Sequence, residues 1–211
     1  MPLSESPAAV PVVFGTLALW SFAICRAAGA AERSATAPGP GGRPPYELAV
    51  AVAILATAMR PPLEALTIGV VCIALVAAAP ADGRTGLLFD AVTRPTTLLV
   101  LALSTVGGRA ELATIGVCCV AGFFAALVAV SRGAWIGLGD VKAIFALAAA
   151  FGAIEATLAV FVACCSGIAT ATIRPPAGDV RTLAFGPHLA VGACATLACG
   201  PYVERIWMHL T

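Results

Sequence analysis

The chain alternates apolar stretches with short segments of glycine, proline and charged residues. Apolar runs that approach roughly 20 residues predict helices that cross a bilayer. Several of these runs are shorter, so a count of seven or six spans also fits the pattern. The pattern predicts an all-α fold, a polytopic integral membrane helix bundle of about eight transmembrane helices, range six to eight. The predicted spans are residues 10–28, 46–59, 66–79, 96–106, 112–130, 141–152, 156–172 and 189–207.

The composition agrees with a lipid environment. Hydrophobic residues make up 60% of the 211 residues, charged residues make up 11%, and the mean hydropathy is +0.98. Soluble globular domains have about a quarter of their residues charged. The net charge is only +1 and no basic run is long enough to follow a phosphate backbone, so the lipid bilayer is the expected partner and nucleic acid is not.

The positions of the arginines and the single lysine predict the orientation in the membrane. Cytoplasmic loops of membrane proteins carry an excess of Arg and Lys. With the N-terminus outside, nine basic residues fall on the cytoplasmic side and three outside. The cytoplasmic set is Arg26, Arg33, Arg43, Arg84, Arg94, Arg132, Lys142, Arg174 and Arg181, and the external set is Arg60, Arg109 and Arg205.

Three regions follow from this pattern. Residues 1–29 are an N-terminal transmembrane anchor, residues 30–45 are a Gly/Pro-rich cytoplasmic linker, and residues 46–211 are the membrane domain. The eight cysteines lie almost wholly inside apolar spans and none forms a CxxC pair. They are therefore expected to be small packing residues, and neither a metal site nor a cofactor is predicted.

The candidate chemistry lies with the aspartates, which all fall at predicted cytoplasmic ends of spans: Asp82, Asp90, Asp140 and Asp179. Asp82 follows the third span, and Asp140 ends the sequence GLGD at the start of the sixth. If those helices are neighbours, the two carboxylates share a proton and can activate a water for peptide hydrolysis. Plainer interpretations remain open for two of these aspartates. Asp140 stands at a predicted helix start, where aspartate is a common N-cap, and Asp179 is expected in a solvated loop.

Four stretches in the same order resemble the type IV prepilin peptidases. "GLGDVK" is similar to the GxGDxK motif of that family, and "DGRTGLLFD" is similar to its D-x(7)-D stretch. "GGRPPYELAVAVAIL" is similar to the family's segment of the form RYPxxE followed by an apolar helix, and "LAFGPHLAVG" resembles the PFGP segment that opens its last helix. The resemblance implies a GxGD-type aspartic endopeptidase of the inner membrane. Its implied substrates are type IV prepilin or pseudopilin precursors, which lose a short basic leader at the cytoplasmic face.

The resemblance can be carried over residue by residue. Asp82 and Asp140 match the two catalytic aspartates of the family, while Gly137, Gly139, Lys142 and Asp90 match supporting positions. Lys142 either steadies the local negative charge or extends to the interface as a snorkelling lysine.

The chain also departs from the family pattern. Phe89 and Ala184 stand where the family usually has proline. The linker has none of the CxxC pairs that the family associates with zinc and N-methylation, so the resemblance implies a short form with peptidase activity and without methyltransferase activity.

Two alternatives stay open. Another GxGD intramembrane protease would pair the motif with YD and PAL sequences, which this chain lacks. A small non-enzymatic transporter would place its acids near the bilayer midplane, whereas these aspartates lie at one interface.

Overall fold

The computed structural model describes residues 9–35, 45–88, 90–173 and 184–210. Most of the predicted linker lies outside these residues, as do Arg43, Phe89, Arg174, Asp179 and Arg181. The side chains at positions 204–208 and 210, including that of Arg205, are outside the description as well.

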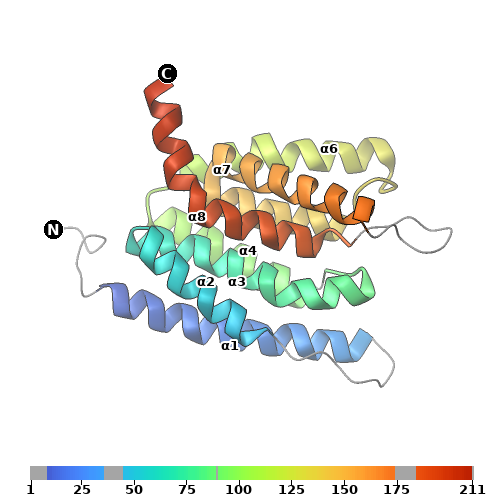
Figure 1. The fold of residues 1–211 in the computed structure, drawn as a ribbon, viewed down its shortest axis with the longest axis horizontal. Helices are drawn as coiled ribbons and strands as arrows, with labels where there is room; N and C mark the ends of the chain where they lie inside the picture. The colour runs from blue at the N-terminus through green and yellow to red at the C-terminus, as the bar shows by residue number, and fades with distance from the viewer. Residues whose placement is uncertain (1–8, 36–44, 89, 174–183, 211) are drawn as a thin grey trace.

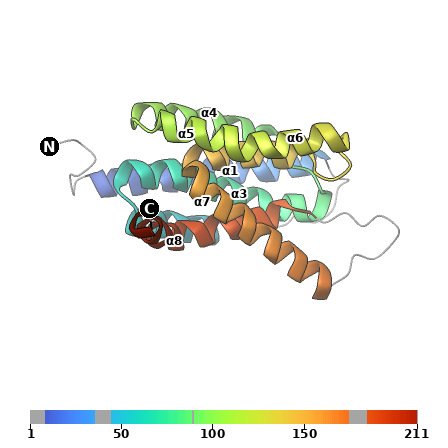
Figure 2. The same ribbon diagram turned by 90° about the horizontal axis from the view of Figure 1, so that it is seen from above.

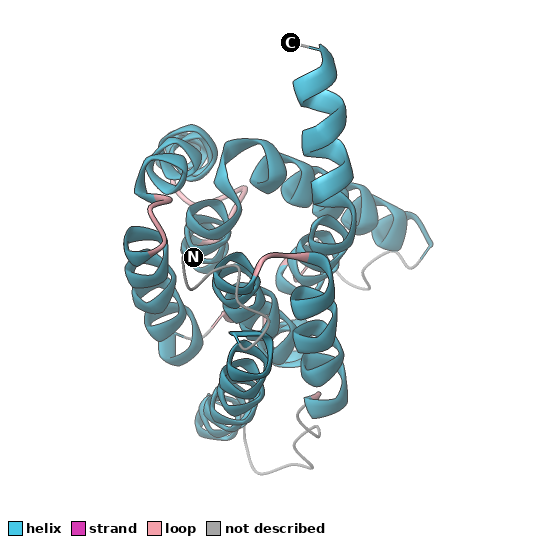
Figure 3. Ribbon diagram, turned by 90° about the vertical axis from the view of Figure 1, so that its left-hand side faces the viewer, coloured by secondary structure: helices cyan, strands magenta, loops and turns pink. Residues whose placement is uncertain are grey.

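The described residues form helices and no strand, which confirms the all-α prediction (Figure 3). Most helices lie roughly side by side along the long axis of the molecule, with the start of α1 and the end of α8 on the left (Figure 1). One element, named η2, is a π-helical segment of five residues. The elements are α1 (Ala9–Ala35), α2 (Tyr46–Met59), α3 (Pro62–Thr85), α4 (Asp90–Val106), α5 (Ala110–Gly116), η2 (Val117–Ala121), α6 (Gly122–Ser131), α7 (Leu138–Ile173) and α8 (Gly186–Leu210).

Among the described residues, four helices are long and apolar enough to cross a membrane. They are α1, α3, α7 and the continuous segment Ala110–Ser131 that contains α5, η2 and α6. The apolar helix α2 has only 14 residues. Each predicted apolar span overlaps a helix, but a count of eight crossing helices stays a prediction because length and hydropathy support four.

Helix α7 changes direction at Gly152 (Figure 2). Gly152 has φ 77° and ψ −177°, a backbone conformation that L side chains rarely adopt. Gly116 of α5 packs against the break, and a Cβ on it would lie 2.4 Å from the carbonyl oxygen of Ala148 and 2.9 Å from Cα of Gly152. The break falls where the sequence predicted the sixth span to end.

The predicted site residues lie at one end of the bundle. The C-terminal end of α3 and the N-terminal ends of α4, α7 and α8 lie together on the right in Figure 1. We call this the aspartate end, because it carries Asp82, Asp90 and Asp140. Helix α1 also reaches it and continues to Ala35, inside the segment expected to be a linker. Buried Glu32 of α1 forms an ion pair there with Arg84 of α3.

Candidate active site

Asp82 lies inside the last turns of α3 instead of after the helix. The helix ends at Gly86, which has φ 64° and donates its N–H to the carbonyl oxygen of Asp82 at 2.7 Å. A left-handed glycine at this position is a common way to end a helix. The Asp82 residue is only 3% exposed.

The carboxylate of Asp82 is held by the start of α8. The N–H of Gly186 donates to Oδ2 of Asp82 at 2.8 Å. The first N–H groups of a helix have no partner within the helix, so a carboxylate satisfies one of them. The pair joins residues 104 positions apart in the sequence.

Gly186 is a site residue that the sequence analysis did not assign. A Cβ at this position would lie 2.6 Å from Oδ2, 3.0 Å from Cγ and 3.1 Å from Cβ of Asp82. Any larger residue would therefore displace the carboxylate or the start of α8. The stretch "LAFGPHLAVG", which resembles a family segment, contains this glycine, but a local sequence does not show which side chain approaches it.

Asp140 is the third residue of α7, in its first turn. Its N–H and that of Val141 donate to the carbonyl oxygen of Gly137 at 3.1 and 3.3 Å. The backbone of Gly137 also lies within hydrogen-bonding reach of the Asp140 carboxylate. Asp140 thus belongs to the first turn itself and does not occupy the N-cap position, and its side chain is only partly buried.

The two motif glycines differ in how closely they are packed. A Cβ on Gly139 would lie 3.1 Å from Cβ of Leu88, so this glycine lets the segment before α4 pack against the start of α7. A Cβ on Gly137 would lie 3.4 Å from Oδ2 of Asp140, which is ordinary contact. Neither glycine has a positive φ, so close approach and not backbone strain explains Gly139.

The fold brings Asp82 and Asp140 together from α3 and α7. Their carboxyl groups are close enough for their charges to interact. One is buried among the helices and the other is partly exposed. In general, when two interacting carboxyl groups have unequal surroundings, one can hold a proton while the other is ionised.

Asp90 and Lys142 form a separate ion-pair cluster beside this pair. Lys142 Nζ lies 2.6 Å from Oδ1 of Asp90, and Arg94 Nη2 lies 2.5 Å from Oδ2. Arg94 thus pairs with the acid four residues before it on α4. The hydrogen bond from Lys142, aided by the charge of Arg94, holds the pKa of the Asp90 carboxyl below its usual value. Lys142 therefore ties the start of α7 to the start of α4.

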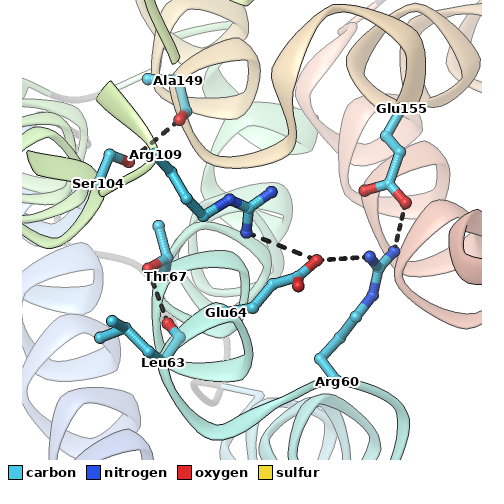
Figure 4. Close-up of polar contacts among 8 residues, drawn as sticks. All are labelled: Arg60, Leu63, Glu64, Thr67, Ser104, Arg109, Ala149 and Glu155. Carbon is cyan, nitrogen blue, oxygen red and sulfur yellow. Dashed lines mark hydrogen bonds and ion pairs between the residues drawn. The ribbon is translucent and has the colours of Figure 1, made fainter. Parts of the chain in front are cut away.

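A second polar cluster lies at the opposite end of α3 (Figure 4). Arg60 pairs with Glu64 and with Glu155 at 2.6 Å each, and Arg109 lies 3.5 Å from Glu64. Arg60 is 7% and Glu155 1% exposed. Glu64 precedes Asp82 by 18 residues, or about 27 Å of helix.

The sequence pattern identified Arg60 and Arg109 only as external basic residues and gave no role to Glu155. A local sequence pattern could not reveal this ion pair, because Arg60 and Glu155 are 95 positions apart and meet only in the tertiary structure. A Cβ on Gly200 of α8 would lie 2.2 Å from Oε1 of Glu155, so this helix also closes over the cluster. In the part of the chain that the structure describes, no group of three His, Cys, Asp or Glu residues is arranged to hold a metal ion.

Comparisons with known proteins point to one family. Residues 69–172 match the model of the type IV leader peptidase family. This range contains Asp82, Asp90, Gly137, Gly139, Asp140 and Lys142.

Two curated relatives come from Burkholderia pseudomallei, strains 1026b and K96243, and each is named prepilin leader peptidase/N-methyltransferase. Each is 33% identical over 138 residues, which cover 61% of this chain and 45% of the relative. The matched region thus spans less than half the length of these relatives. No solved structure shows a significant match to the chain.

Proposed function

Because the chain belongs to the type IV leader peptidase family, we propose that it is a membrane aspartic endopeptidase that removes the basic leader from type IV prepilin or pseudopilin precursors. The observation that carries the proposal is the approach of Asp82 and Asp140 at one end of the bundle. Both residues lie within the segment that matches the family.

In the proposed mechanism the two carboxyl groups share one proton. The ionised carboxylate takes a proton from a water, whose oxygen attacks the carbonyl carbon of the scissile peptide bond. The protonated carboxyl group donates to the carbonyl oxygen as negative charge develops there. Collapse of the tetrahedral intermediate breaks the C–N bond. The leaving amine receives the proton that was taken from water, and a hydroxyl group of the intermediate returns a proton to the other carboxylate, which restores the pair.

The neighbouring residues position this pair. The N–H of Gly186 orients Asp82, and the carbonyl oxygen of Gly137 accepts from the N–H of Asp140 in the first turn of α7. Gly139 admits the chain segment around Leu88, while Lys142 ties α7 to α4 through Asp90. Asp90 pairs with both Arg94 and Lys142, so its carboxylate is unsuited to hold the shared proton. These contacts favour a structural role for Asp90 beside the catalytic pair.

We also propose that the aspartate end faces the cytoplasm from the inner membrane. It carries Arg84, Arg94 and Lys142, whereas Arg60 and Arg109 lie at the other end, in keeping with the excess of basic residues inside. A reporter fused near Pro40 should read cytoplasmic, and one fused after Thr211 should read external. Opposite readings at both fusions would reverse the orientation.

The catalytic assignment is tested by amide substitutions. Asp82→Asn and Asp140→Asn should each abolish cleavage of a tagged pilin-like precursor in membranes, because an amide keeps the size but cannot exchange the proton. Asp90→Asn should retain measurable activity. The abundance of each variant is checked by blot, so that loss of protein is not mistaken for loss of chemistry. If Asp90→Asn is inactive and Asp82→Asn active at equal abundance, the pair is Asp90 with Asp140.

The transporter alternative has one observation in its favour, since Glu155 is buried within the bundle. Arg60 pairs with this glutamate and also with Glu64, which leaves the cluster poorly suited to exchange cations. The N-methyltransferase activity in the names of the relatives is not part of the proposal, because residues 30–45 contain no CxxC pair.

A further inference from the structure

Helix α8 packs antiparallel against the part of α7 that follows the break at Gly152. A Cβ on Gly200 would lie 2.2 Å from Oε1 of Glu155, and a Cβ on Gly192 would lie 2.0 Å from the carbonyl oxygen of Ala159. These two glycines let the helices approach closely. Contacts of this kind set the distance between two helices, but they leave open how far one helix can slide or turn against the other.

A third contact between the same two helices is polar, and it is the one closest in sequence to Gly186. Nδ1 of His188 lies 3.0 Å from Oγ of Ser166, which also lies 2.9 Å from the carbonyl oxygen of Ala163 in its own helix. His188 stands in the first turn of α8, two residues after Gly186, whose N–H donates to Asp82. Because a hydrogen bond depends on angle as well as distance, this contact can fix the start of α8 against α7.

The two contacts of the Ser166 hydroxyl group assign the direction of the hydrogen bond. A hydroxyl group has one proton and can also accept. If Ser166 donates to the carbonyl oxygen of Ala163, its oxygen accepts from Nδ1–H of His188 and both contacts are satisfied. If Ser166 donated to Nδ1 instead, two acceptor oxygens would lie 2.9 Å apart with no proton between them. The donor is therefore Nδ1 of His188.

We propose that His188 and Ser166 are positioning residues, which fix the start of α8 so that the N–H of Gly186 meets the carboxylate of Asp82. This inference rests on the proposed peptidase function. Residues 186–188 belong to one helical turn, so a displacement of His188 moves Gly186 with it. The hydrogen bond thus acts on the catalytic pair through the backbone of α8.

The first test removes the acceptor and measures kcat and KM for cleavage of a tagged precursor in membranes. Ser166→Ala should lower kcat by about 10-fold and leave KM within about twofold, because a small shift of Asp82 misplaces a reacting group. Ser34→Ala is the matched control, since Ser34 also donates within its own helix, to the carbonyl oxygen of Ala31, and it should keep the wild-type kcat. The abundance of each variant is checked by blot. An unchanged kcat in Ser166→Ala, or an equal loss in both variants, would overturn the proposal.

The second test asks which nitrogen of the ring matters. The side-chain amide of His188→Asn places an N–H close to the position of Nδ1, whereas that of His188→Gln reaches toward the position of Nε2. The kcat of His188→Asn should stay within about threefold of the wild type, and that of His188→Gln should fall by about 10-fold. The opposite order, or equal values for the two variants, would contradict donation from Nδ1.

A double variant tests whether the effect passes through Gly186. Gly186→Ala already disturbs the hydrogen bond to Asp82, so adding Ser166→Ala should lower kcat by less than about twofold more. A further loss of about 10-fold would show that Ser166 acts by another route, and it would overturn the proposal.

These assays separate the positioning role from the peptidase function. A wild-type enzyme that does not cleave the precursor would refute the peptidase proposal itself. An active wild type with an unchanged kcat in Ser166→Ala would refute only the role of His188 and Ser166.

Discussion

The contact between Gly186 and Asp82 makes a strong prediction, because a single methyl group can probe it. In Gly186→Ala the new Cβ would lie 2.6 Å from Oδ2 of Asp82, which is about 0.8 Å inside ordinary van der Waals contact. The carboxylate has little room to retreat, since Asp82 is 3% exposed. The substitution should therefore weaken or break the 2.8 Å hydrogen bond from Gly186 and move the carboxylate away from its position beside Asp140.

The size of the effect follows from that displacement. Misplacing a reacting group by about 1 Å can cost about 100-fold in rate, or about 2.7 kcal/mol in the activation barrier. The lost hydrogen bond to a charged group is worth about 1.5–3 kcal/mol, which is of the same order. We expect kcat/KM of Gly186→Ala to fall by about 100-fold.

The assay is cleavage of a tagged precursor in membranes, with the abundance of the variant measured by blot. Gly83→Ala is the matched control, because Gly83 is adjacent to Asp82 but its Cβ would meet only Cγ of Pro187, at 3.7 Å. This control should keep near wild-type activity. Wild-type activity in Gly186→Ala, or equal loss in both variants at equal abundance, would refute the reasoning.

Two further predictions concern the ion pairs. Arg60→Gln removes the guanidinium from beside buried Glu155 and should lower the free energy of unfolding in detergent by about 3–5 kcal/mol. The control Arg94→Gln breaks an exposed pair and should cost less than about 1 kcal/mol, so equal losses would contradict the role of burial. The pKa of Asp90 is lowered, so its ion pairs are present above the ordinary aspartate pKa and are lost only as the pH falls below it. The pH–activity profiles of wild type and Asp90→Asn should therefore have the same shape between about pH 5 and 8; an inflection present in only one of them would contradict this.

The local sequence pattern was sufficient to predict the class of fold. A chain surrounded by lipid must satisfy its backbone hydrogen bonds within each apolar segment, so long apolar runs form helices. The same pattern marked the break at Gly152, because a glycine interrupts two apolar runs there. It predicted helix ends less well, as α3 continues through Asp82 to Thr85. Hydropathy marks where the chain leaves the lipid, whereas a helix ends where its hydrogen bonds end, here at Gly86.

The motifs identified Asp82, Asp140 and the glycines around them, since each motif is a run of neighbouring residues. The contacts among motifs depend on which helices are neighbours, and no local pattern contains that information. Only the tertiary structure placed Gly186 on Asp82, Lys142 on Asp90 and Arg60 on Glu155. These pairs lie 104, 52 and 95 positions apart. In the two that involve buried Asp82 and Glu155, the packing of the bundle excludes water, so each carboxylate needs a partner within the protein.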